Sequence, residues 1–227
     1  MSNAGKSTSL KYLDPKETFI ISCTNKQLQI PGFRKKYPKA TINKDTKTLE
    51  GNWYISNNYT KIENIMNLIS NLRPEIKTIV IDDANYLLSA ETFANALTKG
   101  YEKFSTMAKN YYELIIYCQT LREDITVVFI THLENYGTEL DPLYRIWTTG
   151  KMLTNQINLD GLFSYIIYAE RYVDDVEGDV RYRFKTHTDG NDTCRSVAGC
   201  FPEKYIEPNM KLVIDTINKF ENGDDDN

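Results

Sequence analysis

The sequence lacks long hydrophobic runs, export signals and paired cysteines. No apolar stretch approaches the roughly 18 residues of a membrane span, which argues against a membrane protein. The N-terminus lacks the basic-then-apolar pattern of a signal peptide. The cysteines, at positions 23, 118, 194 and 200, show no C-x-x-C spacing. We therefore expect reduced thiols and a cytoplasmic location.

A strong positive charge is also missing. The 227 residues include 27 Lys and Arg against 31 Asp and Glu, which gives a net charge of −4. This balance excludes a global electrostatic attraction to nucleic acid, so any such binding needs a local basic patch. The hydrophobic content of 41% is sufficient for a real core, and the length suits one large domain.

The most informative stretch is Lys77–Leu88, with the sequence K-T-I-V-I-D-D-A-N-Y-L-L. Its short apolar, β-branched run predicts a strand that is buried on both faces, as in a parallel sheet. Asp82 and Asp83 follow at the carboxyl end, where open α/β sheets bind ligands. An acidic strand end of this form holds Mg²⁺ in P-loop NTPases.

A second motif, Gly5-Lys6-Ser7-Thr8, matches the last four positions of the phosphate-binding loop G-x-x-x-x-G-K-[ST]. In such a loop, amide groups at a helix start meet the phosphates, the lysine reaches the β- and γ-phosphates, and the serine hydroxyl binds Mg²⁺. Four small or polar residues are weak evidence alone, and a solvated N-terminal tail is the alternative. The acidic strand strengthens the phosphate-loop interpretation.

Two further residues are candidates for the same chemistry. Ile125–His132 predicts another buried strand, and it ends in polar residues. His132 at this end could sense a γ-phosphate or orient the attacking water, although a lone histidine is often structural. Lys151 lies in a predicted connection and could reach a phosphate across a subunit interface. A surface lysine is the alternative for Lys151.

The segment Lys26–Lys47 is basic and loop-like, with seven lysines and arginines against one aspartate. Phe33 and Tyr37 are interleaved with these cations. Such a pattern suits single-stranded DNA, because cations follow the phosphates while exposed rings stack on bases. A solvated excursion with ordinary lysines is equally consistent with the sequence.

Helical periodicity appears twice. Apolar residues between 59 and 72 recur at helical spacing, and those between 93 and 117 predict one long helix. We expect the aromatic and apolar residues of the second segment, including Phe93, Leu97 and Tyr101, to pack in the core. Further strands are predicted at 161–169 and 181–186, and a closing helix at 211–220.

Taken in order, several motifs carry a resemblance. They are G-K-S-T, I-V-I-D-D-A-N-Y-L-L, V-V-F-I-T-H, T-T-G-K-M-L and F-K-T-H-T-D-G-N-D-T-C-R-S. The chain resembles the phage-encoded RecA-like P-loop ATPases, AAA-domain nucleotide-binding proteins that include single-strand annealing recombination proteins. The resemblance extends over nearly the whole chain, and the order of the motifs is more specific than any single one.

The resemblance implies a single RecA-like domain over residues 1–220. The polar, acidic composition of residues 221–227 separately predicts a disordered tail. It implies an α/β fold with a mostly parallel central sheet flanked by helices and an antiparallel C-terminal extension. The family begins with a strand that feeds the phosphate loop, and this sequence begins inside the loop. That first strand is therefore expected to be missing from its place beside the Asp82 strand.

For function, the resemblance implies an ATP-binding, Mg²⁺-dependent ATPase that acts on single-stranded DNA in phage recombination or replication, in the host cytoplasm. It implies Asp82 as the Mg²⁺-side carboxylate, Asp83 as the group that positions water, His132 as a sensor and Lys151 as a trans-acting finger in a homo-oligomer. Phosphate and Mg²⁺ contacts are implied at the N-terminal motif: Gly5, Lys6, Ser7 and Thr8.

Two other functions remain open on the sequence. One is a nucleotide-independent DNA-binding or scaffold protein whose phosphate loop is degenerate. The other is a small-molecule phosphotransferase such as a nucleoside kinase, which ranks last because the sequence has no arginine-rich lid segment.

Overall fold

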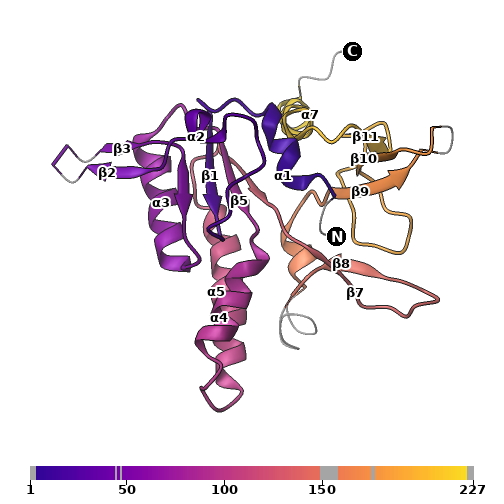
Figure 1. Ribbon diagram of the computed structural model, residues 1–227, viewed down its shortest axis with the longest axis horizontal. Coiled ribbons are helices and arrows are strands. Elements are labelled where there is room, and N and C mark those ends of the chain that lie inside the picture. Colours follow the sequence, from indigo (N-terminus) through magenta and orange to yellow (C-terminus); the bar gives the residue numbers. More distant parts are fainter. Residues whose placement is uncertain (1–3, 44, 47, 149–157, 175–176, 224–227) are drawn as a thin grey trace. The chain divides into compact units, whose positions relative to one another are not determined.

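The computed structural model describes residues 4–43, 45–46, 48–148, 158–174 and 177–223 (Figure 1). The chain forms two compact units, and each has its own hydrophobic core. Unit 1 comprises Met1–Leu13, His132–Trp147 and Phe163–Asn227. Unit 2 comprises Asp14–Thr131 and Thr148–Leu162. The expected single RecA-like domain stays a prediction.

Unit 2 is built on a four-stranded, all-parallel sheet flanked by helices, with the strand order β4-β1-β5-β6. The strands are β1 (Thr18–Ser22), β4 (Trp53–Ile55), β5 (Thr78–Asp82) and β6 (Thr126–Phe129). The helices are α2 (Phe33–Lys36), α3 (Tyr59–Leu72), α4 (Asn85–Ala94) and α5 (Glu102–Cys118). A small hairpin of β2 (Thr41–Asn43) and β3 (Thr48–Glu50) and the 3₁₀ helix η2 (Leu159–Leu162) complete the described elements. The mixed α/β class with a parallel sheet is as the sequence predicts.

Burial follows the strand order. Every residue of β1 and β5 is buried, as expected for the inner strands of a parallel sheet that is flanked by helices. All four residues of β6 are only half-buried, so the prediction that the strand within Ile125–His132 is buried is wrong. The place beside the Asp82 strand, where a missing strand was expected, is occupied on one side by β1 and on the other by β6.

Helix α3 spans the predicted segment from Tyr59 to Leu72. The Asn58 side chain caps it by accepting a hydrogen bond from the Lys61 amide at 3.0 Å, which satisfies one free donor of the first turn. Its buried residues lie three and four positions apart, at Ile62, Ile65, Met66 and Ile69. This stripe packs against the core and holds the helix in place.

The prediction of one long helix over 93–117 is only partly right: α5 covers the part from Glu102 onward, but the segment is not one continuous helix. Helix α4 ends at Ala94, a connection follows with Gly100 at φ 96°, and α5 begins at Glu102. Figure 1 shows α4 and α5 as a hairpin that runs away from the sheet. The predicted core residues Phe93, Leu97 and Tyr101 are 80%, 97% and 89% exposed, because they lie at the tip of this hairpin.

Unit 1 contains a three-stranded antiparallel sheet in the order β11-β10-β9 and a separate two-stranded pair of β7 and β8. These strands are β7 (Leu133–Asn135), β8 (Tyr144–Ile146), β9 (Tyr168–Val173), β10 (Val180–Lys185) and β11 (Tyr205–Ile206). Its helices are α1 (Lys6–Ser9), the 3₁₀ helix η1 (Leu10–Tyr12) and α7 (Met210–Asn222). Phe184, Phe201 and Val213 form one core cluster between sheet and helix. An antiparallel C-terminal region is therefore present, as expected.

Two boundaries differ from the predictions. The strand expected over 161–169 is absent as such, because η2 covers its beginning and β9 starts only at Tyr168. The acidic tail does not begin at 221, because Glu221 and Asn222 are the last two residues of α7. Gly223 follows as the C-cap in a left-handed conformation with φ 72°. Residues 224–227 lie outside the described part of the chain. No described helix is both long and apolar enough to cross a bilayer.

Candidate functional site

The acidic end of β5 lies at the carboxyl edge of the parallel sheet. Asp82 is the last residue of the strand and is only 3% exposed, while Asp83 is half-buried. Ser22 lies opposite Asp82 in the β1 ladder, and the Cys23 amide donates to the Asp82 carbonyl oxygen at 3.0 Å. Two carboxylates thus stand where ligands bind in open α/β sheets.

Asp83 has an unusual backbone. It has a positive φ of 58°, and among the described residues it is alone in this apart from glycines. Such a conformation costs free energy for a residue with a Cβ and is often found at functional sites. Its carboxylate accepts a hydrogen bond of 3.4 Å from the hydroxyl of Thr24, the second residue after β1. The sharp turn therefore directs the chain out of β5 and into α4.

The carboxylates also act on a neighbouring thiol. Burial raises the pKa of Cys23 well above its ordinary value, and the negative charges of Asp82 and Asp83 raise it further. A thiol with a raised pKa stays protonated and is a poor nucleophile at neutral pH. Cys23 is therefore a packing residue rather than a reactive group of this site.

The N-terminal motif begins a short helix in unit 1. Gly5 has φ 81°, a left-handed conformation that glycine adopts without strain, and α1 starts at the next residue. The Ser9 amide donates to the Gly5 carbonyl oxygen at 3.0 Å, and the Ser9 hydroxyl donates to the Lys6 carbonyl oxygen at 2.6 Å. Lys6 and Ser7 are half-buried, and Thr8 is exposed.

The other predicted residues fall in different places. His132 belongs to unit 1 and is half-buried, and its carbonyl oxygen accepts a hydrogen bond from the Trp147 amide at 2.9 Å. Lys151 lies outside the described residues. The structure therefore brings Asp82 and Asp83 together in unit 2, and it places the Gly5–Thr8 motif and His132 in unit 1.

Sequence reasoning missed two polar residues of the acidic edge, Thr24 and Asn85. Thr24 bonds to Asp83, and Asn85 opens α4 and is only 7% exposed. A signal was available, because each follows an apolar strand within a few positions, where the carboxyl edge of the sheet begins. Neither has a distinctive sequence motif, so their position could be recognised only after the strands were paired.

The residues of this edge fit Mg²⁺ better than a metal held by protein ligands alone. Within the described residues, no group of three or more His, Cys, Asp or Glu side chains could hold a metal ion. Mg²⁺ does not require one, because it is usually bound by one or two carboxylates together with waters and substrate phosphates. Asp82 and Asp83 supply two such carboxylates, and the Thr24 hydroxyl donates a hydrogen bond to the carboxylate of Asp83.

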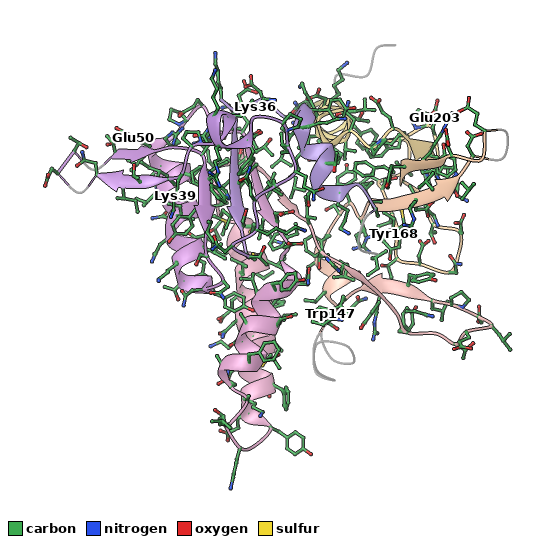
Figure 2. All side chains as sticks on the ribbon, viewed as in Figure 1. Lys36, Lys39, Glu50, Trp147, Tyr168 and Glu203 are labelled. Atoms are coloured by element: carbon green, nitrogen blue, oxygen red, sulfur yellow. The ribbon has the colours of Figure 1, made fainter. Side chains whose placement is uncertain are left out.

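The basic segment Lys26–Lys47 exposes its described cationic side chains but not the aromatic rings that were expected beside them. Lys26, Arg34, Lys35, Lys36 and Lys39 are all exposed, and no ion pair involves them within the described residues. Figure 2 labels Lys36 and Lys39 at this surface.

The aromatic side chains of this segment point inward, so the prediction that they are exposed is wrong. Phe33 and Tyr37 are each only 1% exposed. Their ring centroids lie 5.4 Å apart, and the Trp53 ring meets Phe33 edge-on at 5.1 Å. Burial also raises the pKa of Tyr37 to about 12. These rings hold α2 onto the core and cannot stack on bases.

Comparison with known proteins does not assign a family. No protein-family model matches the chain, and no curated protein is significantly similar to it. The function must therefore be argued from the chemistry of the described residues.

Proposed function

We propose that this protein is an ATP-binding, Mg²⁺-dependent ATPase of the RecA-like P-loop class that acts on single-stranded DNA in phage recombination or replication. The observation that carries the proposal is the acidic end of β5. Asp82 and Asp83 follow a fully buried central strand of an all-parallel sheet, which is the arrangement that Mg²⁺-nucleotide sites use.

The division of roles follows from the chemistry of each group. Lys6 and Ser7 would contact the phosphates, with backbone amides at the start of α1. Asp82 would supply a carboxylate oxygen to Mg²⁺, and bound Mg²⁺ neutralises charge on the β- and γ-phosphates. Asp83 would position the attacking water, and its Thr24 hydrogen bond keeps the carboxylate in place. His132 and Lys151 stay candidates for a sensor and for a trans-acting finger in a homo-oligomer.

Single-stranded DNA has two candidate contact surfaces in unit 2. The first is the exposed cluster of cations from Lys26 to Lys39, which can follow a phosphate backbone. The second is the tip of the α4–α5 hairpin, where Phe93 and Tyr101 expose 80% and 89% of their surface. Exposed rings stack on bases of any sequence, so the tip supplies what the buried Phe33 and Tyr37 do not.

The charge at the tip favours the same partner. Between residues 93 and 109, Lys99, Lys103 and Lys109 stand against a single acidic residue, Glu102. The ammonium group of Lys103 donates to the carbonyl oxygens of Asn95 and Thr98, at 3.3 Å and 2.8 Å, which fixes the connection between the helices. A positive, aromatic tip in a protein of net charge −4 is suited to a single strand.

The hydrolysis reaction tests the catalytic part of this proposal. We expect wild-type protein to hydrolyse ATP with Mg²⁺, Lys6→Ala to lose both binding and turnover, and Asp83→Asn to bind ATP normally but lose turnover. Phosphate release and binding of a fluorescent ATP analogue would be measured on the same preparations. Unimpaired turnover in Asp83→Asn would reject the assigned role of Asp83.

One observation favours a second candidate, a nucleotide-independent DNA-binding or scaffold protein. The Gly5–Thr8 motif and the acidic strand end belong to different compact units. In that case DNA binding would be insensitive to ATP and to Lys6→Ala, and no phosphate would be released.

A further inference from the structure

Two polar side chains beside the acidic strand end have buried atoms without a hydrogen-bond partner. The loops after β5 and β6 are joined there, because the Ala84 amide donates to the Ile130 carbonyl oxygen at 2.8 Å. Asn85 directly follows Ala84, and Thr131 directly follows Ile130. Both side chains therefore start within one residue of the same backbone hydrogen bond.

The unmet hydrogen bonds lie on oxygen atoms. The Asn85 Oδ1 atom and the Thr131 Oγ1 atom are inaccessible to solvent, and neither has a hydrogen-bond partner among the described residues. Asn85 as a whole is 7% exposed. Buried polar atoms in folded proteins are nearly always paired, and an unpaired one indicates a missing water, ion or ligand. These two oxygens belong to the joined loops after β5 and β6, and a group that donates hydrogen bonds would satisfy either of them.

The neighbouring groups indicate which kind of ligand could donate these hydrogen bonds. The edge offers two carboxylates, Asp82 and Asp83, together with the Thr24 hydroxyl. An apolar ligand would leave the two orphaned oxygens unpaired, and an anion would be repelled by the carboxylates. Water bound to Mg²⁺ suits the site, because Mg²⁺ keeps several of its waters and each water has hydrogens to donate.

We propose that Asn85 and Thr131 accept hydrogen bonds from the water ligands of a Mg²⁺ ion held at Asp82 and Asp83. They are positioning residues: they touch the metal through its waters and orient the hydration shell. The inference rests on the proposed function, because it requires the metal site of that function, but it assigns roles to residues that the sequence motifs do not include. Partners of this kind typically change metal affinity by about 10- to 100-fold when they are removed.

Metal binding can be measured without hydrolysis. Mn²⁺ would serve as the probe, in complexes with a non-hydrolysable ATP analogue, and its free concentration would be followed by electron paramagnetic resonance. We expect Asn85→Leu and Thr131→Val to weaken Mn²⁺ binding about 10-fold or more. Thr131→Ser keeps the acceptor oxygen and should retain wild-type affinity. Asn85→Asp keeps the acceptor oxygen and adds a negative charge, so it should bind Mn²⁺ at least as tightly as wild type. Asn71→Leu, on the exposed face of α3, is the matched control and should change nothing.

Each outcome decides between the two proposals. If wild-type protein binds neither the analogue nor Mn²⁺, the proposed function fails and this inference fails with it. If wild-type protein binds both and the Leu and Val variants bind Mn²⁺ equally well, only this inference is overturned. It is also overturned if Asn85→Asp and Thr131→Ser weaken binding as much as the Leu and Val variants do, because packing would then explain the loss.

Discussion

At the scale of single residues, Lys185 is a buried cation close to three carboxylates. Its side chain is 2% exposed and forms ion pairs with Asp189 and Asp192, and the Asp192 side chain is 3% exposed. Glu170 lies 3.9 Å from the same ammonium group. Asp192 also accepts a hydrogen bond from the Cys194 amide at 3.0 Å. The cluster therefore holds the loop after β10 in one conformation.

Removing this cation should be costly. We expect Lys185→Met to lower the free energy of unfolding by about 3 to 5 kcal/mol, because it leaves the Asp192 carboxylate buried without its partner. Urea denaturation would measure the change. The matched control is Lys211→Met, whose ion pair with Asp215 is about half exposed on both sides and should change stability by less than about 0.5 kcal/mol. Equal effects from the two variants would contradict this assignment.

The sequence did not indicate that Lys185 is buried. The strand itself was predicted closely, at 181–186 against the observed Val180–Lys185. The burial depends on carboxylates at positions 189 and 192, which reach the lysine only when the following loop folds back. Such pairing is a property of the fold and has no local signature.

At the scale of elements, local periodicity predicted where helices form better than what they face. The segment Tyr59–Leu72 was predicted and is observed as a helix. Its apolar stripe and its Asn58 cap are both local features, because they involve residues only one or two helical turns apart. The segment from Phe93 to Tyr101 has the same kind of periodicity but lies at the end of a hairpin. Periodicity identifies an apolar face and gives no information about whether a neighbour covers it.

The exposed tip leads to a prediction that separates binding from stability. We expect the triple variant Phe93→Ser, Leu97→Ser, Tyr101→Ser to keep wild-type stability within about 0.5 kcal/mol per site, because these side chains are at least 80% exposed. Its affinity for single-stranded DNA should fall, since each lost base–aromatic contact is worth about 1 to 3 kcal/mol. Fluorescence anisotropy with a labelled oligonucleotide would measure this loss.

Two control variants complete that experiment. Leu140→Ser, at an apolar residue that is 99% exposed in unit 1, should leave DNA binding unchanged. Leu114→Ala, at a fully buried residue of α5, should cost about 2 to 5 kcal/mol of stability. DNA affinity that is unchanged in the triple variant would rule out the tip as a contact surface.

At the scale of the whole molecule, the parallel sheet and its acidic edge were predictable from the sequence K-T-I-V-I-D-D. Its apolar β-branched residues indicate a buried strand, and its two aspartates indicate a polar strand end. The order of the strands could not be predicted in this way. Both β5 and β6 come from short apolar runs, yet β6 lies at the edge of the sheet and β5 lies inside it. The residues around the acidic edge, Thr24 and Asn85, come from segments about 60 positions apart. Thr24 reaches Asp83 only because β1 and β5 are neighbours in the sheet.

The central claim is that this chain binds a nucleotide through Lys6 with the help of Mg²⁺. The most direct test is an equilibrium titration of a fluorescent ATP analogue, with Mg²⁺ and with a chelator, on wild-type protein and Lys6→Ala. Lys11→Ala serves as a nearby control, because Lys11 is exposed on η1 and lies over the Tyr12 ring at 4.7 Å. We predict Mg²⁺-dependent binding by wild type and Lys11→Ala and its loss in Lys6→Ala. Equal affinity in all three proteins, or no binding by any of them, would contradict the claim.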